Sequence, residues 1–183
     1  MLSKKNFFLN YFKDLRNLLL FEDQILKNLL LVREKILKLK LNNKKILIFG
    51  NGGSASISSH FSTDMTKFAK IRCLNFNEAN LITCFANDYG YENWAAKSID
   101  FYGEKGDILI AISSSGRSKN IINACKAAKR KKFSFIVTLS GFKKNNPLSK
   151  IGDMNFWIKS DIYNYVENVH QILLLSLVDS LKK

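Results

Sequence analysis

Two short apolar runs in this sequence each end in a loop of small polar residues, and each loop leads into a segment with helical spacing. Residues 45–49 end at Gly50, which is followed by Asn-Gly-Gly-Ser, and Asp107–Ile112 run directly into Ser113–Ser118. Apolar runs this short are typical of strands buried on both faces of a sheet. Short strands that alternate with helices predict an α/β fold with a mostly parallel sheet covered on both faces.

The rest of the chain continues this alternation. The spacing predicts further strands over 81–85, 133–139 and 155–158, with a helix over 81–85 as the alternative. It also predicts helices over 54–70, 91–101, 119–131 and 161–181, a turn over 87–90 and a loop over 140–150. These elements make a five-stranded sheet flanked by helices. No repeat, low-complexity tract or linker interrupts the chain, so residues 1–183 are expected to form one domain.

Residues 1–41 form an N-terminal helical segment in this reading. Apolar residues recur at helical spacing from Leu15 to Leu37, and a stretch this long predicts two helices with a break near Phe21–Asp23. So apolar a pair must pack either on its own domain or on another subunit.

The formal net charge of +14 raises the question of an anionic partner. The basic residues are scattered along the chain and nearly all are Lys. A protein that reads bases or phosphates favours the bidentate fork of Arg. Nucleic acid is therefore not expected as a partner, and attraction of phosphorylated metabolites is the milder consequence of the charge.

Nothing in the sequence indicates a membrane span or an export signal. The longest apolar stretches, such as Ile172–Leu175, fall far short of the ~20 residues that a bilayer span requires. Asp14 and Arg16 interrupt the apolar N-terminal stretch, and no small-residue cleavage site follows. The three cysteines lack metal-type spacing and suit reduced thiols. We therefore expect a cytoplasmic protein.

The two polar loops have the composition of a phosphate site. In an open parallel sheet, ligands bind beyond the carboxyl ends of the strands. Serine hydroxyls and free amides at a helix N-terminus hold an anion, so Ser113, Ser115 and Ser118 are placed to surround one phosphate. Neither loop continues as Gly-Lys-Ser/Thr or as Gly-x-Gly-x-x-Gly, which disfavours a nucleotide or dinucleotide site. For one loop alone, helix capping explains the serines equally well, but two such loops on one sheet favour a ligand.

Five segments together resemble the signature of the bacterial phosphoheptose isomerases, in order and in spacing: residues 50–56, His60-Phe61, residues 87–91, Gly106-Asp107 and residues 112–118. The resemblance implies the SIS (sugar isomerase) fold, a three-layer sandwich with the N-terminal helices packed at a subunit interface. It also implies a cytoplasmic homotetramer with active sites between subunits. Such enzymes interconvert sedoheptulose 7-phosphate and glycero-manno-heptose 7-phosphate for surface polysaccharide synthesis, and many bind zinc.

The resemblance also assigns binding residues. The serine loop would hold the phosphate of a phosphorylated sugar, and the first loop and residues 87–88 would contact the sugar or the phosphate. The residues at these positions are Asn51, Gly52, Ser54, Asn87, Asp88, Ser113, Ser114, Ser115 and Ser118.

The catalytic positions depart from the family pattern. Aldose–ketose isomerisation needs a base that moves a proton between adjacent carbons, and an acid or metal that steadies the oxygen charge. The carboxylate one turn after His60 is Asp64 where the family has Glu, and the Gln position of the last helix is Glu167. The catalytic His position is Leu175, and His170 matches a different histidine of that helix. Asp64 and Glu167 remain as the candidate catalytic carboxylates.

The same residues are the candidate metal ligands. His60 and Asp64 share one face of a helix, and Glu167 is the third candidate. An imidazole with two carboxylates suits a divalent ion such as zinc or manganese.

Three functions fit these residues. An isomerase of a phosphorylated seven-carbon sugar is favoured because both loops are intact. A non-catalytic adaptor, like the SIS tetramers that associate with a replication initiator, fits the missing histidine and the basic surface but has no need of sugar loops. A sugar-phosphate sensor would keep the loops and lose the acid and base.

Overall fold

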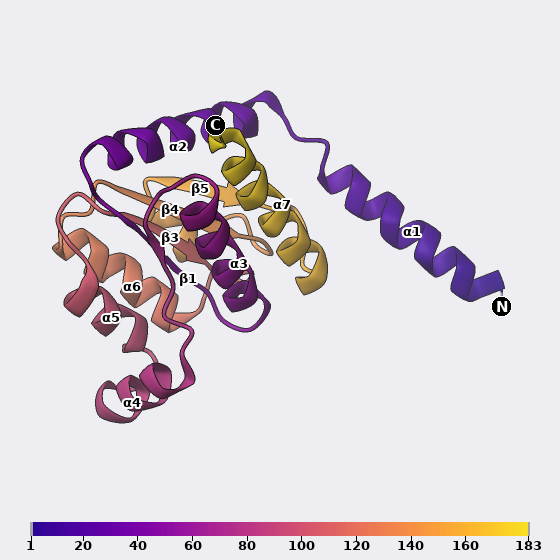
Figure 1. Cartoon of the computed structure of the whole chain (residues 1–183). Coiled ribbons are helices and arrows are strands. Elements are labelled where there is room, and N and C mark those ends of the chain that lie inside the picture. Colours follow the sequence, from indigo (N-terminus) through magenta and orange to yellow (C-terminus); the bar gives the residue numbers. More distant parts are fainter. Residues whose placement is uncertain (1, 183) are drawn as a thin grey trace.

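Five short strands form one parallel sheet in the order β2–β1–β3–β4–β5 (Figure 1). The computed structural model describes residues 2–182. The strands are β1 (Ile46–Phe49), β2 (Cys73–Leu74), β3 (Ile108–Ile112), β4 (Phe135–Ser140) and β5 (Met154–Trp157). The central pair, β1 and β3, runs in register from Ile46 opposite Ile108 to Phe49 opposite Ala111. The five-stranded sheet expected from the sequence is confirmed, and all of its pairings are parallel.

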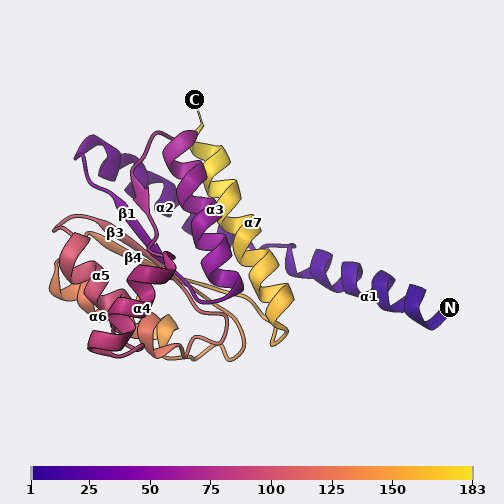
Figure 2. The same ribbon diagram turned by 60° about the horizontal axis from the view of Figure 1, so that its bottom comes forward.

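Helices cover both faces of this sheet and give three layers (Figures 1 and 2). One face carries α2 (Asp23–Leu41), α3 (Gly53–Lys67) and α7 (Tyr163–Leu181), and the other carries α5 (Trp94–Tyr102) and α6 (Lys119–Arg130). Side chains alternate along β1, so that Ile46 and Ile48 join the first core and Leu47 and Phe49 join the second. All four are fully buried, which explains why the strands are uninterrupted apolar runs.

The buried carboxylate of Asp107 fixes the start of the two central strands. It accepts hydrogen bonds from the backbone N–H of Lys45 at 3.1 Å and of Glu104 at 2.8 Å. The Lys45 ammonium lies 2.9 Å from the same carboxylate. A carboxylate without solvent exposure is tolerated only with such partners. Asp107 therefore links the beginning of β3 to the beginning of β1.

The strand expected over 81–85 is wrong, because this segment lies within α4 (Ala79–Tyr89). The second strand is instead β2, which has only two residues. Leu81, Ile82 and Phe85 pack partly buried against the α5–α6 core at a helical spacing. The turn expected over 87–90 is the last turn of α4, which ends at Gly90 with a φ of 82°. A short 3-10 helix, η1 (Leu148–Lys150), lies between β4 and β5.

The N-terminal segment forms two helices, α1 (Leu2–Leu18) and α2, with the break where the sequence predicts it. α2 lies against the body of the fold, whereas α1 extends away from it (Figures 1 and 2). α1 packs against the core through Leu15 and Leu18 near its end, and the Tyr11 ring lies 4.6 Å from the Tyr165 ring of α7. Phe7, Phe8, Leu9 and Phe12 are each more than half exposed. Within residues 2–182, no helix combines the length and the apolarity needed to cross a bilayer.

His170 of α7 is fully buried in the core. Its Nε2 lies 3.3 Å from the carbonyl oxygen of Ser140 at the end of β4, and its Nδ1 has no partner among the described residues. Burial disfavours the charged imidazole and lowers the pKa of His170 from 6.5 to about 4. The side chain therefore links α7 to β4 as a neutral imidazole.

This burial predicts a fold that loses stability in mild acid. The unfolded chain protonates this histidine near pH 6.5 and the folded chain only near pH 4, so stability is present above pH 6.5 and is lost as the pH falls through that window. We expect His170 alone to lower the free energy of unfolding by roughly 3 kcal/mol between neutral pH and about pH 4. Urea unfolding across this range measures the loss. His170→Gln should lose less stability than the unsubstituted protein over this pH range. His60→Gln, at a half-exposed position, should lose nearly as much as the unsubstituted protein. Equal losses in His170→Gln and the unsubstituted protein would contradict the assignment.

Candidate functional site

The loops after β1 and β3 meet at one edge of the sheet, because these neighbouring parallel strands end on the same side. Between the loops and the start of α7 lies a cavity of about 210 Å³. Its lining residues are Asn51, Ser54, Ile112, Ser113, Ser114, Ser115, Ser118, Tyr163 and Glu167. The structure thus brings together the serines of both loops, Asn51 and Glu167. Gly52 precedes α3 as its N-cap residue and does not line the cavity.

The serine loop is a tight turn in which two amides, those of Ser114 and Ser115, face no protein acceptor among the described residues. The backbone N–H of Gly116 donates to the carbonyl of Ser113 at 2.8 Å and closes the turn. The Ser114 hydroxyl is buried and also lacks a partner within residues 2–182. Free donors of this kind at the entry to a helix form an anion site.

Helix capping does not account for these serines. Ser118 is the N-cap residue of α6, but its side chain makes no capping bond. Its hydroxyl instead lies 2.9 Å from the hydroxyl of Ser113. α3 likewise begins at Gly52 without a side-chain cap. In α3 the amides of Ser54 and Ala55 donate to the carbonyls of Asn51 and Gly52, whereas the first amides of α6, at residues 119–121, donate to no acceptor among the described residues. A bound anion would satisfy those of α6.

Asn51 is held in place by two residues that the sequence analysis did not single out. Its side-chain amide forms a reciprocal pair with Asn120, with N–O distances of 3.0 and 2.8 Å. The Tyr91 hydroxyl donates to the Asn51 Oδ1 at 3.1 Å. These bonds leave one N–H of the Asn51 amide for a ligand. Asn120 is buried and lies two residues after Ser118. Its closeness to the serine loop in sequence is the one feature that could have indicated its role.

Glu167 of α7 crosses over the start of α3. Gly53 makes room for it, since a Cβ there would lie 2.2 Å from the Glu167 Oε2. Burial raises the pKa of this carboxyl above its usual value. Tyr163, one turn earlier on α7, lines the cavity as well and was missed in the sequence. A carboxyl with a raised pKa beside an anion site can donate or accept a proton near neutral pH more readily than an ordinary one.

Beyond Glu167 the site continues into a second hollow of about 300 Å³. Glu167 lines both hollows and separates them. The second is lined by Tyr11, Gly53, Ser56, Ile57, Asn164, Asn168 and Gln171 as well. Hydroxyl and amide groups in this number suit a ligand with many hydroxyls.

The three candidate metal ligands predicted from the sequence do not lie together within residues 2–182. His60 and Asp64 do pair, with Nε2 and Oδ2 3.2 Å apart. Glu167, however, lies at Gly53, seven residues before His60, which is roughly 10 Å along the helix axis. No group of three His, Cys, Asp or Glu side chains within residues 2–182 is placed to hold a metal. Two ligands fall short of the three or four protein ligands typical of zinc.

Asn87 and Asp88 are likewise not brought to the cavity by their own chain. Both are exposed near the end of α4, where the Asn87 amide donates to the Asp88 carboxylate at 3.0 Å. Asp64 also lies outside the cavity. The roles predicted for these residues remain predictions.

Known proteins of similar sequence and structure identify the family of this chain. The SIS domain family model matches residues 10–140. The chain is 34% identical over 148 residues to the phosphoheptose isomerase of Helicobacter pylori strain HPAG1, which covers 78% of this chain and 76% of the relative. This chain belongs to the phosphoheptose isomerase family of SIS-domain proteins. The phosphoheptose isomerase of Neisseria gonorrhoeae superposes with a TM-score of 0.90 at 25% identity, over 99% of this chain and 98% of that one. The family resemblance and the SIS fold expected from the motifs are confirmed.

The position of Glu167 predicts how this family member binds anions. Its carboxylate shares the cavity with the serine loop, so its charge should weaken an anion bound there. We expect Glu167→Gln to bind sulfate several-fold to about tenfold more tightly at neutral pH. The difference should shrink as the pH falls through the raised pKa of Glu167, where the native side chain becomes neutral. Sulfate titration calorimetry measures this, with the exposed Glu34→Gln as the charge-matched control. Equal affinities at all pH values would show that Glu167 does not face the anion.

Proposed function

We propose that this chain is an isomerase that interconverts sedoheptulose 7-phosphate and glycero-manno-heptose 7-phosphate in the cytoplasm, for surface polysaccharide synthesis. The observation that carries the proposal is the serine loop, where the amides of Ser114 and Ser115 and the buried Ser114 hydroxyl have no partner within residues 2–182. A phosphate supplies the acceptors that these donors lack. An adaptor protein would gain nothing from keeping them unpaired.

Glu167 is the residue we assign to the proton transfer. In the ketose-to-aldose direction, the Glu167 carboxylate takes a proton from C1 while the C2 carbonyl oxygen gains one from water, which gives the enediol. Glu167 then returns its proton to C2 as the O1 hydroxyl gives its own to water and becomes the aldehyde oxygen. A single carboxyl between the phosphate end and the polar hollow can carry the proton between the two adjacent carbons. Asp64 would take part only in a site completed by a neighbouring subunit.

A sugar-phosphate sensor is the second candidate. Leu175 occupies the position where the family pattern calls for the catalytic histidine, and it is partly buried among apolar residues of α7. Binding would survive this change because the serine loop does not depend on Leu175. Turnover is therefore the property that separates the two candidates.

Turnover of sedoheptulose 7-phosphate, followed by NMR of the sugar, tests the proposal. We expect an aldoheptose phosphate from the unsubstituted protein. Ser115→Ala should weaken binding of the sugar phosphate by about tenfold, because a charge-assisted hydrogen bond is lost. Glu167→Gln should lower kcat by about 10² or more without a similar loss of binding. Ser176→Ala, on the exposed side of α7, serves as the control. Binding without turnover would favour the sensor, and no binding would reject both candidates.

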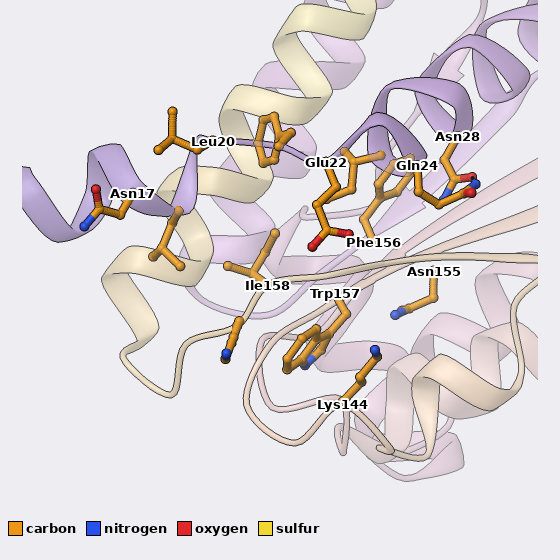
Figure 3. Close-up of a pocket in the computed structure, with 14 residues that line it drawn as sticks. Asn17, Leu20, Glu22, Gln24, Asn28, Lys144, Asn155, Phe156, Trp157 and Ile158 are labelled. Carbon is orange, nitrogen blue, oxygen red and sulfur yellow. Dashed lines mark hydrogen bonds between the residues drawn. The ribbon is translucent and has the colours of Figure 1, made fainter.

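We also propose that the chain assembles as a homotetramer through α1. A hollow of about 410 Å³ lies where the α1–α2 connection meets β5. Leu20, Phe156 and Trp157 are among the residues that line it (Figure 3). It lies at the base of α1, whose Phe8 and Phe12 are more than half exposed. An exposed apolar surface of this size is typical of a protein–protein interface, and we propose that a second copy of the chain buries it.

The mass of the assembly in solution tests this proposal. Light scattering after size exclusion should give a tetramer for the unsubstituted protein. The double variant Phe8→Ser/Phe12→Ser should give a smaller species, because two apolar anchors are lost. Phe68→Ser, at an exposed site on the body of the fold, should leave the mass unchanged. A monomeric unsubstituted protein would refute the proposal.

A further inference from the structure

The loop after β4 is built directly against the serine loop. The backbone N–H of Gly141 donates to the carbonyl of Ser114 at 2.8 Å, and that of Leu148 donates to the carbonyl of Gly116 at 3.0 Å. The carbonyl of Ser113 is already used by the turn. The carbonyl oxygens of Ser113, Ser114 and Gly116 thus accept from protein donors, whereas the amides of Ser114 and Ser115 donate to no protein acceptor among the described residues. A loop whose carbonyls are paired and whose N–H groups are unpaired presents hydrogen-bond donors to an anion.

One side chain, Asn146, holds the β4 loop in this shape. It is 1% exposed, and its amide nitrogen donates to the Ser140 hydroxyl at 3.0 Å and to the Lys143 carbonyl at 2.9 Å. Its Oδ1 accepts from the backbone N–H of Ser149 at 2.9 Å. Asn146 therefore ties the end of β4, the middle of the loop and η1 to one another.

The same side chain packs on the serine loop itself. Gly116 has a φ of +66°, and a Cβ there would lie 2.1 Å from the Asn146 Oδ1. A side chain at position 116 would be strained and would collide with Asn146. The two loops are therefore fitted to each other at this contact, which lies next to the Leu148–Gly116 hydrogen bond.

We propose that Asn146 is a positioning residue that keeps the serine loop in its anion-binding conformation. It does not line the cavity, so it acts through Gly116 and through the β4 loop. The identity of the anion as a phosphate rests on the proposed function, but the positioning role does not. No motif marks Asn146 in the sequence, because its partners come from the loop that contains it and from the separate loop after β3.

Asn146→Ala tests the proposal, with Asn145→Ala as the matched control. Asn145 is exposed, and its side chain makes no hydrogen bond within the described part of the chain. The first readout is backbone amide hydrogen exchange in the ligand-free protein. We expect faster exchange at Gly116, Gly141 and Leu148 in Asn146→Ala and unchanged exchange in the control.

The second readout is binding of inorganic phosphate and of sedoheptulose 7-phosphate. We expect Asn146→Ala to weaken both by the same factor, about tenfold or more, because only the phosphate end is disturbed. A residue that served packing alone would lower the melting temperature without this equal loss. Phosphate affinity within about twofold of the unsubstituted protein would overturn the proposal.

Ser140→Ala guards against a variant that fails to fold. It removes one of the three hydrogen bonds of the Asn146 side chain, so the loss of affinity should be smaller and in the same direction. In the double variant Ser140→Ala/Asn146→Ala, the losses of phosphate binding free energy should not add, since both substitutions act through the same side-chain contact. Should the unsubstituted protein bind neither ligand, the proposed function fails. Hydrogen exchange alone then decides whether Asn146 positions the loop.

Discussion

The pairing of β1 with β3 is the constraint on which the rest of the structure depends. These strands are neighbours in the sheet but are separated in sequence by α3, β2, α4 and α5. The Asp107 carboxylate fixes one end of the pair, and the polar loops leave from the other. Because parallel strands end on one side, Asn51 and the serine loop become neighbours and the Asn51–Asn120 pair can close. The site is therefore a consequence of strand order.

The polar groups of the site divide into those that the fold satisfies and those that it leaves open. The Asn51 amide, the carbonyls of Ser113, Ser114 and Gly116, and the Ser113 and Ser118 hydroxyls have protein partners. The backbone amides of Ser114 and Ser115 and the Ser114 hydroxyl have none within residues 2–182. An unsatisfied buried donor costs about 1–3 kcal/mol. That the open groups gather in one cavity, while their surroundings are satisfied, is what indicates a ligand rather than a loosely built loop.

Much of the fold followed from the sequence, because the strands are short apolar runs that helices separate. The exceptions have physical causes. β2 is too short to leave a pattern, and Leu81, Ile82 and Phe85 form an apolar run whose helical placement depends on tertiary packing. The serine pocket was predictable because its residues are contiguous, whereas Tyr163, Asn120 and Asn146 act through contacts between distant segments. The three candidate metal ligands are not gathered within residues 2–182 for a similar reason, since periodicity gives the face of a helix but not the turn of α3 that Glu167 reaches.

The position of Glu167 bears on what the loss of the family histidine means. With Leu175 in its place, α7 offers one carboxyl to the cavity, and burial raises the pKa of that carboxyl. The carboxylate also lies at the N-terminus of α3, where the helix dipole favours its charged form. A phosphate bound at the serine loop would push the pKa further up, because two like charges would share the cavity. Ligand binding itself would then bring Glu167 closer to the pKa that a proton-transfer group needs at neutral pH.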